Sequence, residues 1–183
     1  MESTADRYRK VAASFTRRVR DVPPDAWDNP APCEGWVARD VVRHLVEWMP
    51  GLFFSTAGID PPVIPSVDDD PAGAWDALDS ALVGALEDPE IAATEFDSPA
   101  GRHSVEAAID MFGISDILIH TWDLARATGL DETLDPDEVH GLLVGMQPMD
   151  AVLRASGHFG PRVEVPSDAD EQTRLIAFTG RQP

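Results

Sequence analysis

The chain has 183 residues, with 14 Lys and Arg against 33 Asp and Glu, so its formal charge at pH 7 is −19. This excess negative charge makes nucleic acid and anionic membrane surfaces unfavourable partners. The length is typical of one domain with its own core, and a hydrophobic content of 43% argues against disorder. Cys33 is the only cysteine, which excludes a disulfide within the chain. Because the sequence has neither a run of ~18 apolar residues nor the apolar block of a secretory signal, we expect a cytoplasmic protein.

The first predicted helix covers about residues 3–20 and is strongly basic. Its six Lys and Arg against two acidic residues give the segment 1–20 a local charge of 6 − 2 = +4. We expect these basic side chains to lie on a solvated face and to pair with acidic neighbours. A patch that binds phosphate or an acidic partner is the alternative hypothesis.

Apolar residues repeat at intervals of three and four along most of the remaining chain, which predicts further helices. Proline and glycine set their ends, with Pro50 expected to kink or end one helix and Gly129 to cap another. The segment 90–103 shows no clear pattern apart from a turn at 98–101. The further helices are expected over about 36–50, 71–87, 104–127, 135–157 and 168–178. We therefore predict one all-α domain over residues 1–183, with a helical bundle over about 1–157 and a C-terminal helical extension over about 158–183.

Polar side chains interrupt the apolar faces of two of these helices. Asp116 and His120 are four residues apart, so they lie one turn from each other on a face otherwise apolar. A carboxylate on such a face is costly unless it is paired, hydrogen-bonded or bound to a metal. His44 interrupts the apolar stripe of the helix at 36–50 in the same way. The three residues could supply a divalent ion with nitrogen and oxygen ligands and leave a position open; a buried, hydrogen-bonded Asp–His couple would explain the same spacing.

The chain resembles actinobacterial metal-binding proteins of the DinB/YfiT-like superfamily, in particular the N-terminal domain of mycothiol-dependent maleylpyruvate isomerase. The resemblance is carried by residues 32–45, PCEGWVARDVVRHL, and residues 116–125, DILIHTWDLA. It implies a DinB-like four-helix bundle in which His44, Asp116 and His120 hold one divalent metal ion, zinc or nickel. The isomerase has glutamate where this chain has Asp116, and the shorter side chain could move the metal or change the preferred ion.

The resemblance also implies an activity, although it identifies no catalytic or cofactor-binding residue. Related bundles use a low-molecular-weight thiol such as mycothiol, and a bound metal would lower the pKa of that thiol for attack on a small electrophile. The chain would then be a metal-dependent thiol transferase or isomerase, acting as a monomer or homodimer with no nucleic-acid or membrane partner. A non-catalytic metal- or ligand-binding module in stress response or regulation is the alternative.

Three other residues have roles that the sequence leaves open. Asp123 follows His120 by one turn and could orient its imidazole, or it could pair with an arginine of the same or an adjoining helix. Cys33 could be a fourth ligand or a nucleophile, although a lone cysteine is more often an inert buried residue. His158 stands between glycines that could let the C-terminal tail fold over the mouth of the bundle.

Overall fold

The computed structural model of the chain describes residues 2–99, 101–155, 157 and 159–183, and most of these residues are helical. The α-helices are α1 (Thr4–Asp21), α2 (Ala38–Pro50), α3 (Pro71–Glu87), α4 (Pro89–Ala92), α5 (Val105–Ala108), α6 (Ile114–Thr128), α7 (Pro136–Met146), α8 (Asp150–Ala155) and α9 (Glu171–Phe178). Between them lie the π-helical turns η1 (Gly51–Ser55) and η2 (Ile109–Gly113) and the 3-10 turn η3 (Gln147–Met149). The strands β1 (Glu95–Ser98) and β2 (Gly101–Ser104) form a small antiparallel hairpin. The all-α prediction is confirmed.

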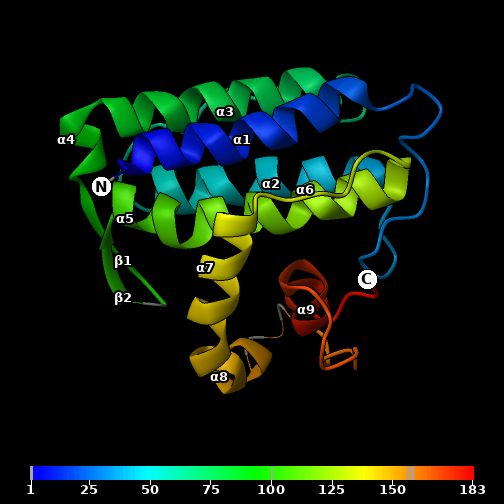
Figure 1. Cartoon of the computed structure of the whole chain (residues 1–183). Helices are drawn as coiled ribbons and strands as arrows, with labels where there is room; N and C mark the ends of the chain where they lie inside the picture. The colour runs from blue at the N-terminus through cyan, green and yellow to red at the C-terminus, as the bar shows by residue number, and fades with distance from the viewer. Residues whose placement is uncertain (1, 100, 156, 158) are drawn as a thin grey trace.

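Four long helices form the body of the molecule. α1, α2, α3 and α6 run side by side, and the main contacts join both α1 and α2 to α3 and α6 (Figure 1). Their apolar faces meet in a core that contains Tyr8, Phe15, Leu45 and Trp75, each with no exposed surface. Burial of each such side chain contributes about 1.5–3 kcal/mol relative to an exposed one. The four-helix bundle is therefore the arrangement in which the predicted apolar stripes are all covered.

Local signals set most helix ends where the sequence predicted them. The Ser3 hydroxyl accepts a hydrogen bond from the Asp6 amide at the start of α1, and Asp70 caps α3 in the same way. Gly129 ends α6 with a left-handed φ of 72°. The helical path continues past Pro50 into η1, where the hydrogen bonds widen to the five-residue spacing of a π-helix.

Other boundaries differ from the predictions. The second helix begins at Ala38, two residues late, and the Asp40 carboxylate accepts the Val37 amide at 3.0 Å. The last helix begins at Glu171, three residues late, after its cap Asp170. The fourth and fifth predicted helices are each divided, by η2 and by η3. The hairpin lies in the segment for which the periodicity gave no prediction, because β1 has a single apolar residue, Phe96, and β2 has none, so no alternating pattern appears.

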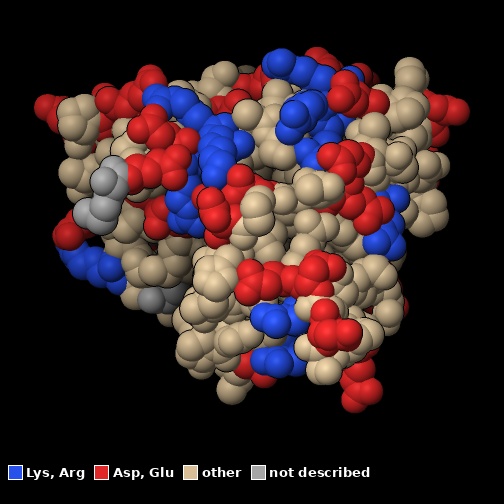
Figure 2. All heavy atoms as spheres, viewed as in Figure 1, with Lys and Arg blue, Asp and Glu red and all other residues tan. Residues whose placement is uncertain are grey.

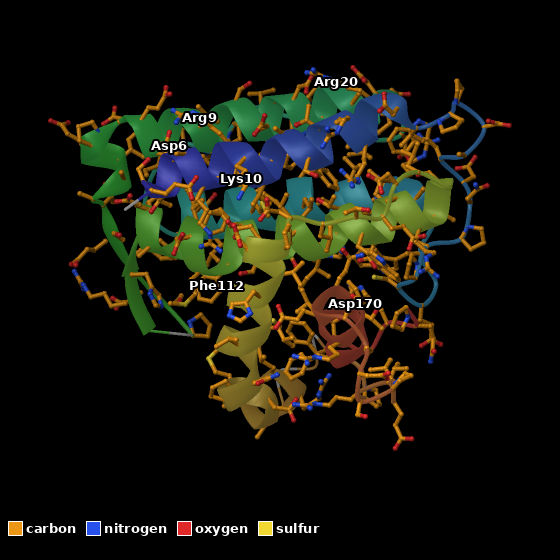
Figure 3. The ribbon with its side chains drawn as sticks, viewed as in Figure 1. Asp6, Arg9, Lys10, Arg20, Phe112 and Asp170 are labelled. Atoms are coloured by element: carbon orange, nitrogen blue, oxygen red, sulfur yellow. The ribbon has the colours of Figure 1, made fainter. Side chains whose placement is uncertain are left out.

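The C-terminal helices α7, α8 and α9 lie on one side of the bundle, and α7 and α9 pack on each other (Figure 1). Basic side chains of α1 connect the bundle to the segment 131–138 that leads into α7, and Lys10 is one of them (Figure 3). The pairs are Arg7 with Glu138, Lys10 with Asp135, and Arg18 with the carbonyls of Asp131 and Thr133. The predicted pairing with acidic residues is confirmed for Arg7, Arg9, Lys10 and Arg20, whereas Arg18 is buried and does not lie on the predicted solvated face. The domain boundary near residue 157 stays a prediction.

Charged side chains of both signs adjoin one another on the face shown in Figure 2. On α1, Arg9 and Arg20 pair with Glu87 and Asp76 of α3. The positive charge of this helix is thus neutralised locally. Within the described ranges, no helix combines the length and the apolar character that a membrane crossing requires.

Candidate metal centre

The structure brings the three predicted ligands together between α2 and α6. His44 comes from α2, and its Nε2 atom lies 3.1 Å from Oδ2 of Asp116 on α6. One turn along α6, Nε2 of His120 lies 3.4 Å from Oδ1 of the same carboxylate. One ligand atom from each residue lies within 4.8 Å of the other two. We call these three residues the candidate metal centre.

Exposure differs among the three side chains. The side chain of His120 is 5% exposed, whereas those of His44 and Asp116 are 32% and 27% exposed. The prediction that Asp116 is buried in the apolar face of its helix is therefore wrong. The neighbouring positions of the predicted stripe, Ile117, His120 and Leu124, are buried, so Asp116 lies at the exposed edge of that stripe beside His44. As a result, the centre is closed on the His120 side and open to solvent on the other.

Two tryptophans surround the imidazole rings. The Trp36 ring stacks on that of His120, with a centroid distance of 5.8 Å and an interplanar angle of 17°, and it also contacts His44. The indole Nε1–H of Trp48 donates to Oδ2 of Asp116 at 3.0 Å. These roles are not predicted by the sequence. Trp48 could have been found, since it follows His44 by four residues and therefore shares its helix face.

Asp123 fixes the orientation of the His120 ring. Its Oδ2 atom lies 2.8 Å from Nδ1 of His120, and the carboxylate has no exposed surface. Both oxygens of Asp123 also accept hydrogen bonds from Arg181, at 2.6 and 2.7 Å. The orienting role that the sequence suggested for Asp123 matches this geometry, whereas the alternative pairing with Arg126 or Arg43 is wrong, because the arginine partner is Arg181 of the C-terminal segment. Because Nδ1 faces Asp123, Nε2 of His120 is the atom directed at Asp116.

The charges around the candidate metal centre favour one cation, placed between Nε2 of His120 and Asp116. Burial lowers the pKa of His120, but the carboxylates of Asp116 and Asp123 outweigh burial and raise it to about 9. Burial likewise raises the pKa of Asp116, yet the two imidazoles, with His120 the larger influence, hold it below its usual range. Without a metal, a proton therefore lies between Nε2 of His120 and Asp116 at pH 7. A metal ion bound there would replace that proton.

Cys33 lies behind the centre, on the side of Asp123. Its sulfur is 3.7 Å from Oδ2 of Asp123 and 3.4 Å from Nη2 of Arg181. Burial, and then the charge of Asp123, raise the pKa of this thiol to about 12. Cys33, His120 and Asp123 form a second group of closely spaced metal-ligating atoms, but Arg181 already occupies both oxygens of Asp123. These surroundings favour a structural thiol over a nucleophile. His158 lies outside the described residues.

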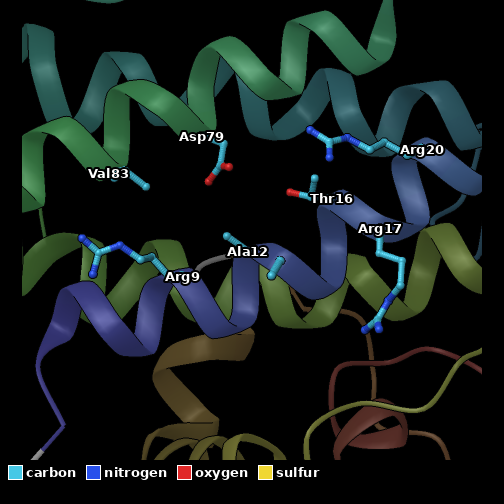
Figure 4. Close-up of a pocket in the computed structure, with 8 residues that line it drawn as sticks. Arg9, Ala12, Thr16, Arg17, Arg20, Asp79 and Val83 are labelled. Carbon is cyan, nitrogen blue, oxygen red and sulfur yellow. The ribbon is translucent and has the colours of Figure 1, made fainter.

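A pocket of about 300 Å³ lies elsewhere, between α1 and α3 (Figure 4). Part of its polar lining already has partners, since the Trp75 indole donates to the Thr16 hydroxyl at 2.8 Å. Arg9 and Arg20 at its rim pair with acidic residues of α3. This pocket is separate from the candidate metal centre.

Comparisons with known proteins agree with the first of the two sequence motifs. Residues 8–58 match the family described as the mycothiol maleylpyruvate isomerase N-terminal domain, a range that includes His44, Trp36 and Trp48 but neither Asp116 nor His120. Two uncharacterized proteins of Mycobacterium tuberculosis, from strains CDC 1551 and H37Rv, are each 26% identical to the chain over 177 residues, with 95% of both chains covered. No solved structure matches the chain significantly. The family match confirms the resemblance to the mycothiol maleylpyruvate isomerase N-terminal domain that the motif around His44 predicted.

Proposed function

We propose that the chain binds one divalent metal ion, zinc or nickel, through His44, Asp116 and His120. The supporting observation is that two imidazole Nε2 atoms face the two oxygens of one carboxylate, at 3.1 and 3.4 Å. Two ligands bound to one zinc ion at about 2.0–2.2 Å in a tetrahedral arrangement are about 3.4 Å apart, so only small shifts would admit the ion. The contact between His120 and Asp123 matches the carboxylate–histidine arrangement that orients ligands at zinc sites.

The charges of the residues around the ion favour an anionic fourth ligand. With both imidazoles neutral, the carboxylates of Asp116 and Asp123 contribute −2, Arg181 contributes +1 and a divalent ion would contribute +2, which leaves +1. A thiolate would neutralise that charge, and a bound divalent ion supplies the chemistry that lowers a thiol pKa. The ligand would approach from the side on which His44 and Asp116 are exposed.

The function that this arrangement supports best is a metal-dependent transferase or isomerase that uses a mycothiol-type thiol and acts on a small electrophile. The family match over residues 8–58 favours mycothiol as the thiol. Within the chain, Asp123 would orient His120, and the rings of Trp36 and Trp48 would shield the centre from water on two sides. The chain's own residues would thus position and shield the ion, while the thiol would carry out the attack.

The metal assignment is tested by measuring the metal content of the purified protein and its zinc affinity. We expect about one ion per chain for the wild type and loss of binding in His44→Ala and Asp116→Ala, because each variant removes one of only three ligands. His140→Ala is the matched control, since this exposed histidine pairs with Glu171 far from the centre. Unchanged metal content in both ligand variants would exclude the site.

The thiol assignment needs a separate measurement on the zinc-loaded protein. We expect mycothiol binding in a calorimetric titration, and turnover of an electrophilic dye only when mycothiol is present. Binding and turnover should both disappear in Asp116→Ala. Zinc binding without mycothiol binding would instead favour the non-catalytic module.

A further inference from the structure

The C-terminal segment reaches the candidate metal centre through Arg181. Its Nε and Nη2 atoms each donate to a different oxygen of Asp123, at 2.6 and 2.7 Å, which makes a bidentate pair. The Arg181 side chain is 12% exposed and that of Asp123 is fully buried. Because water has little access to this pair, the guanidinium and the carboxylate hold each other in a fixed geometry.

A close approach of two glycines places Arg181 at this position. Gly180 has a φ of 92°, in the left-handed region, and a Cβ atom on it would lie 2.9 Å from Cα of Gly160. A side chain at residue 180 is therefore disfavoured both by the backbone conformation and by the lack of space. The turn that follows α9 depends on this contact, and Arg181 is the next residue.

We propose that Arg181 is a positioning residue of the metal centre, acting through Asp123 on the imidazole of His120. Arg181 fixes both oxygens of Asp123, and Oδ2 then fixes Nδ1 of His120, so that Nε2 points at Asp116. Without Arg181, the buried Asp123 would be held by the imidazole and the weakly interacting Cys33 thiol alone. The expected effect on metal affinity rests on the proposed function, whereas the effect on the His120 ring does not.

The first test compares zinc dissociation constants by competition with a chelator. Loss of a side chain that supports a ligand weakens metal binding by about 10- to 100-fold, which we expect for Arg181→Gln. Arg181→Lys should fall between this variant and the wild type, because lysine keeps the charge but not the bidentate geometry. Arg174→Gln is the matched control from the same segment, since Arg174 has only a 3.8 Å contact with Glu171. Gly180→Ala changes no charge and should weaken zinc binding in the same direction.

The second test uses the metal-free protein and follows the proton on Nδ1 of His120 by NMR with nitrogen-labelled histidine. This proton is buried and hydrogen-bonded to Asp123, so it should exchange slowly with solvent in the wild type and in Arg174→Gln. Exchange should be faster in Arg181→Gln and in Gly180→Ala, with thermal melts confirming that each variant is folded.

The two measurements separate the failure of the inference from the failure of the proposed function. Wild-type zinc affinity and wild-type proton exchange in folded Arg181→Gln would overturn the positioning role and leave the metal site intact. Absence of zinc binding by the wild type would overturn the proposed function, and the proton exchange would then decide alone whether Arg181 positions His120.

Discussion

Two carboxylates of the same helix flank the imidazole of His120, and their surroundings are opposite. Asp116 faces Nε2 of the ring and its side chain is 27% exposed, whereas Asp123 faces Nδ1 and is fully buried. The charge of Asp123 is balanced by Arg181, which occupies both of its oxygens. Asp116 has two imidazoles and an indole as partners, and the proposed metal ion would replace the proton of His120.

The contrast shows how one histidine can be held firmly on one side and remain available on the other. A buried ion pair is costly to break, because either partner alone leaves an uncompensated charge. A half-exposed carboxylate can exchange partners at lower cost, because water can reach it. Under the proposed function, Asp123 would support the centre and Asp116 would bind the ion.

The largest expected difference between the two carboxylates is in the stability of the metal-free protein. Asp123→Ala would leave the buried Arg181 without its partner and should lower the free energy of unfolding by about 3–5 kcal/mol. Asp116→Ala leaves Nε2 of the buried His120 without its carboxylate partner, but it leaves no arginine unpaired, so it should cost about 1–3 kcal/mol, less than Asp123→Ala. Urea denaturation at pH 7 measures both. Equal losses would show that the two sites do not differ as their burial indicates.

The pH dependence of stability should report the loss of the additional proton from His120. The pKa of His120 rises from 6.5 to about 9 on folding, so its stabilising contribution is complete below pH 6.5 and is lost as the pH rises through 9. The loss should amount to at most about 3 kcal/mol in the metal-free protein. The pKa of Asp116 is lowered, so its contribution is present above 3.8 and disappears only as the solution becomes more acidic.

Bound zinc should abolish this loss of stability at alkaline pH, because the ion would take the place of the proton on His120. Calorimetric titrations at pH 7 in two buffers of different ionisation enthalpy should reveal the release of about one proton from His120 per zinc ion. Asp116→Asn should show a weaker alkaline loss in the metal-free protein, since the carboxylate that most raises the His120 pKa is gone. Proton release of zero in the wild type would contradict the placement of a proton on Nε2.

The bundle and the three candidate ligands could be predicted because short-range patterns in the sequence indicate them. Asp116 and His120 share a face through helical spacing, and His44 lies in a short motif, so no distant contact had to be known. The exposure of Asp116 could not be predicted in this way, because helical spacing places it on one stripe with the buried Ile117 and His120 and does not show where the covering elements end.

The contact between Asp123 and Arg181, which supports the centre, could not be predicted from the sequence for a different reason. Asp123 and Arg181 are 58 residues apart in the chain, and the segment between them turns several times before Gly180 meets Gly160. Such a contact depends on the packing of α7 and α9 and not on any repeat. A buried acidic residue on a helix indicates that a partner exists, but it does not indicate where in the chain that partner lies.

The smallest expected effect is that of changing Cys33, which lies on the Asp123 side of the His120 ring. Its thiol pKa is raised to about 12, by burial first and by Asp123 second, so iodoacetamide at pH 8 should modify the native protein at least about a hundredfold more slowly than the urea-unfolded chain. Cys33→Ala should retain zinc affinity within about twofold, because the sulfur is hydrogen-bonded to Arg181 and Asp123 and not to any of the three candidate ligands. Rapid modification of the native thiol, or loss of zinc in the variant, would instead place Cys33 among the reactive groups and extend the chemistry of the centre to the Asp123 side.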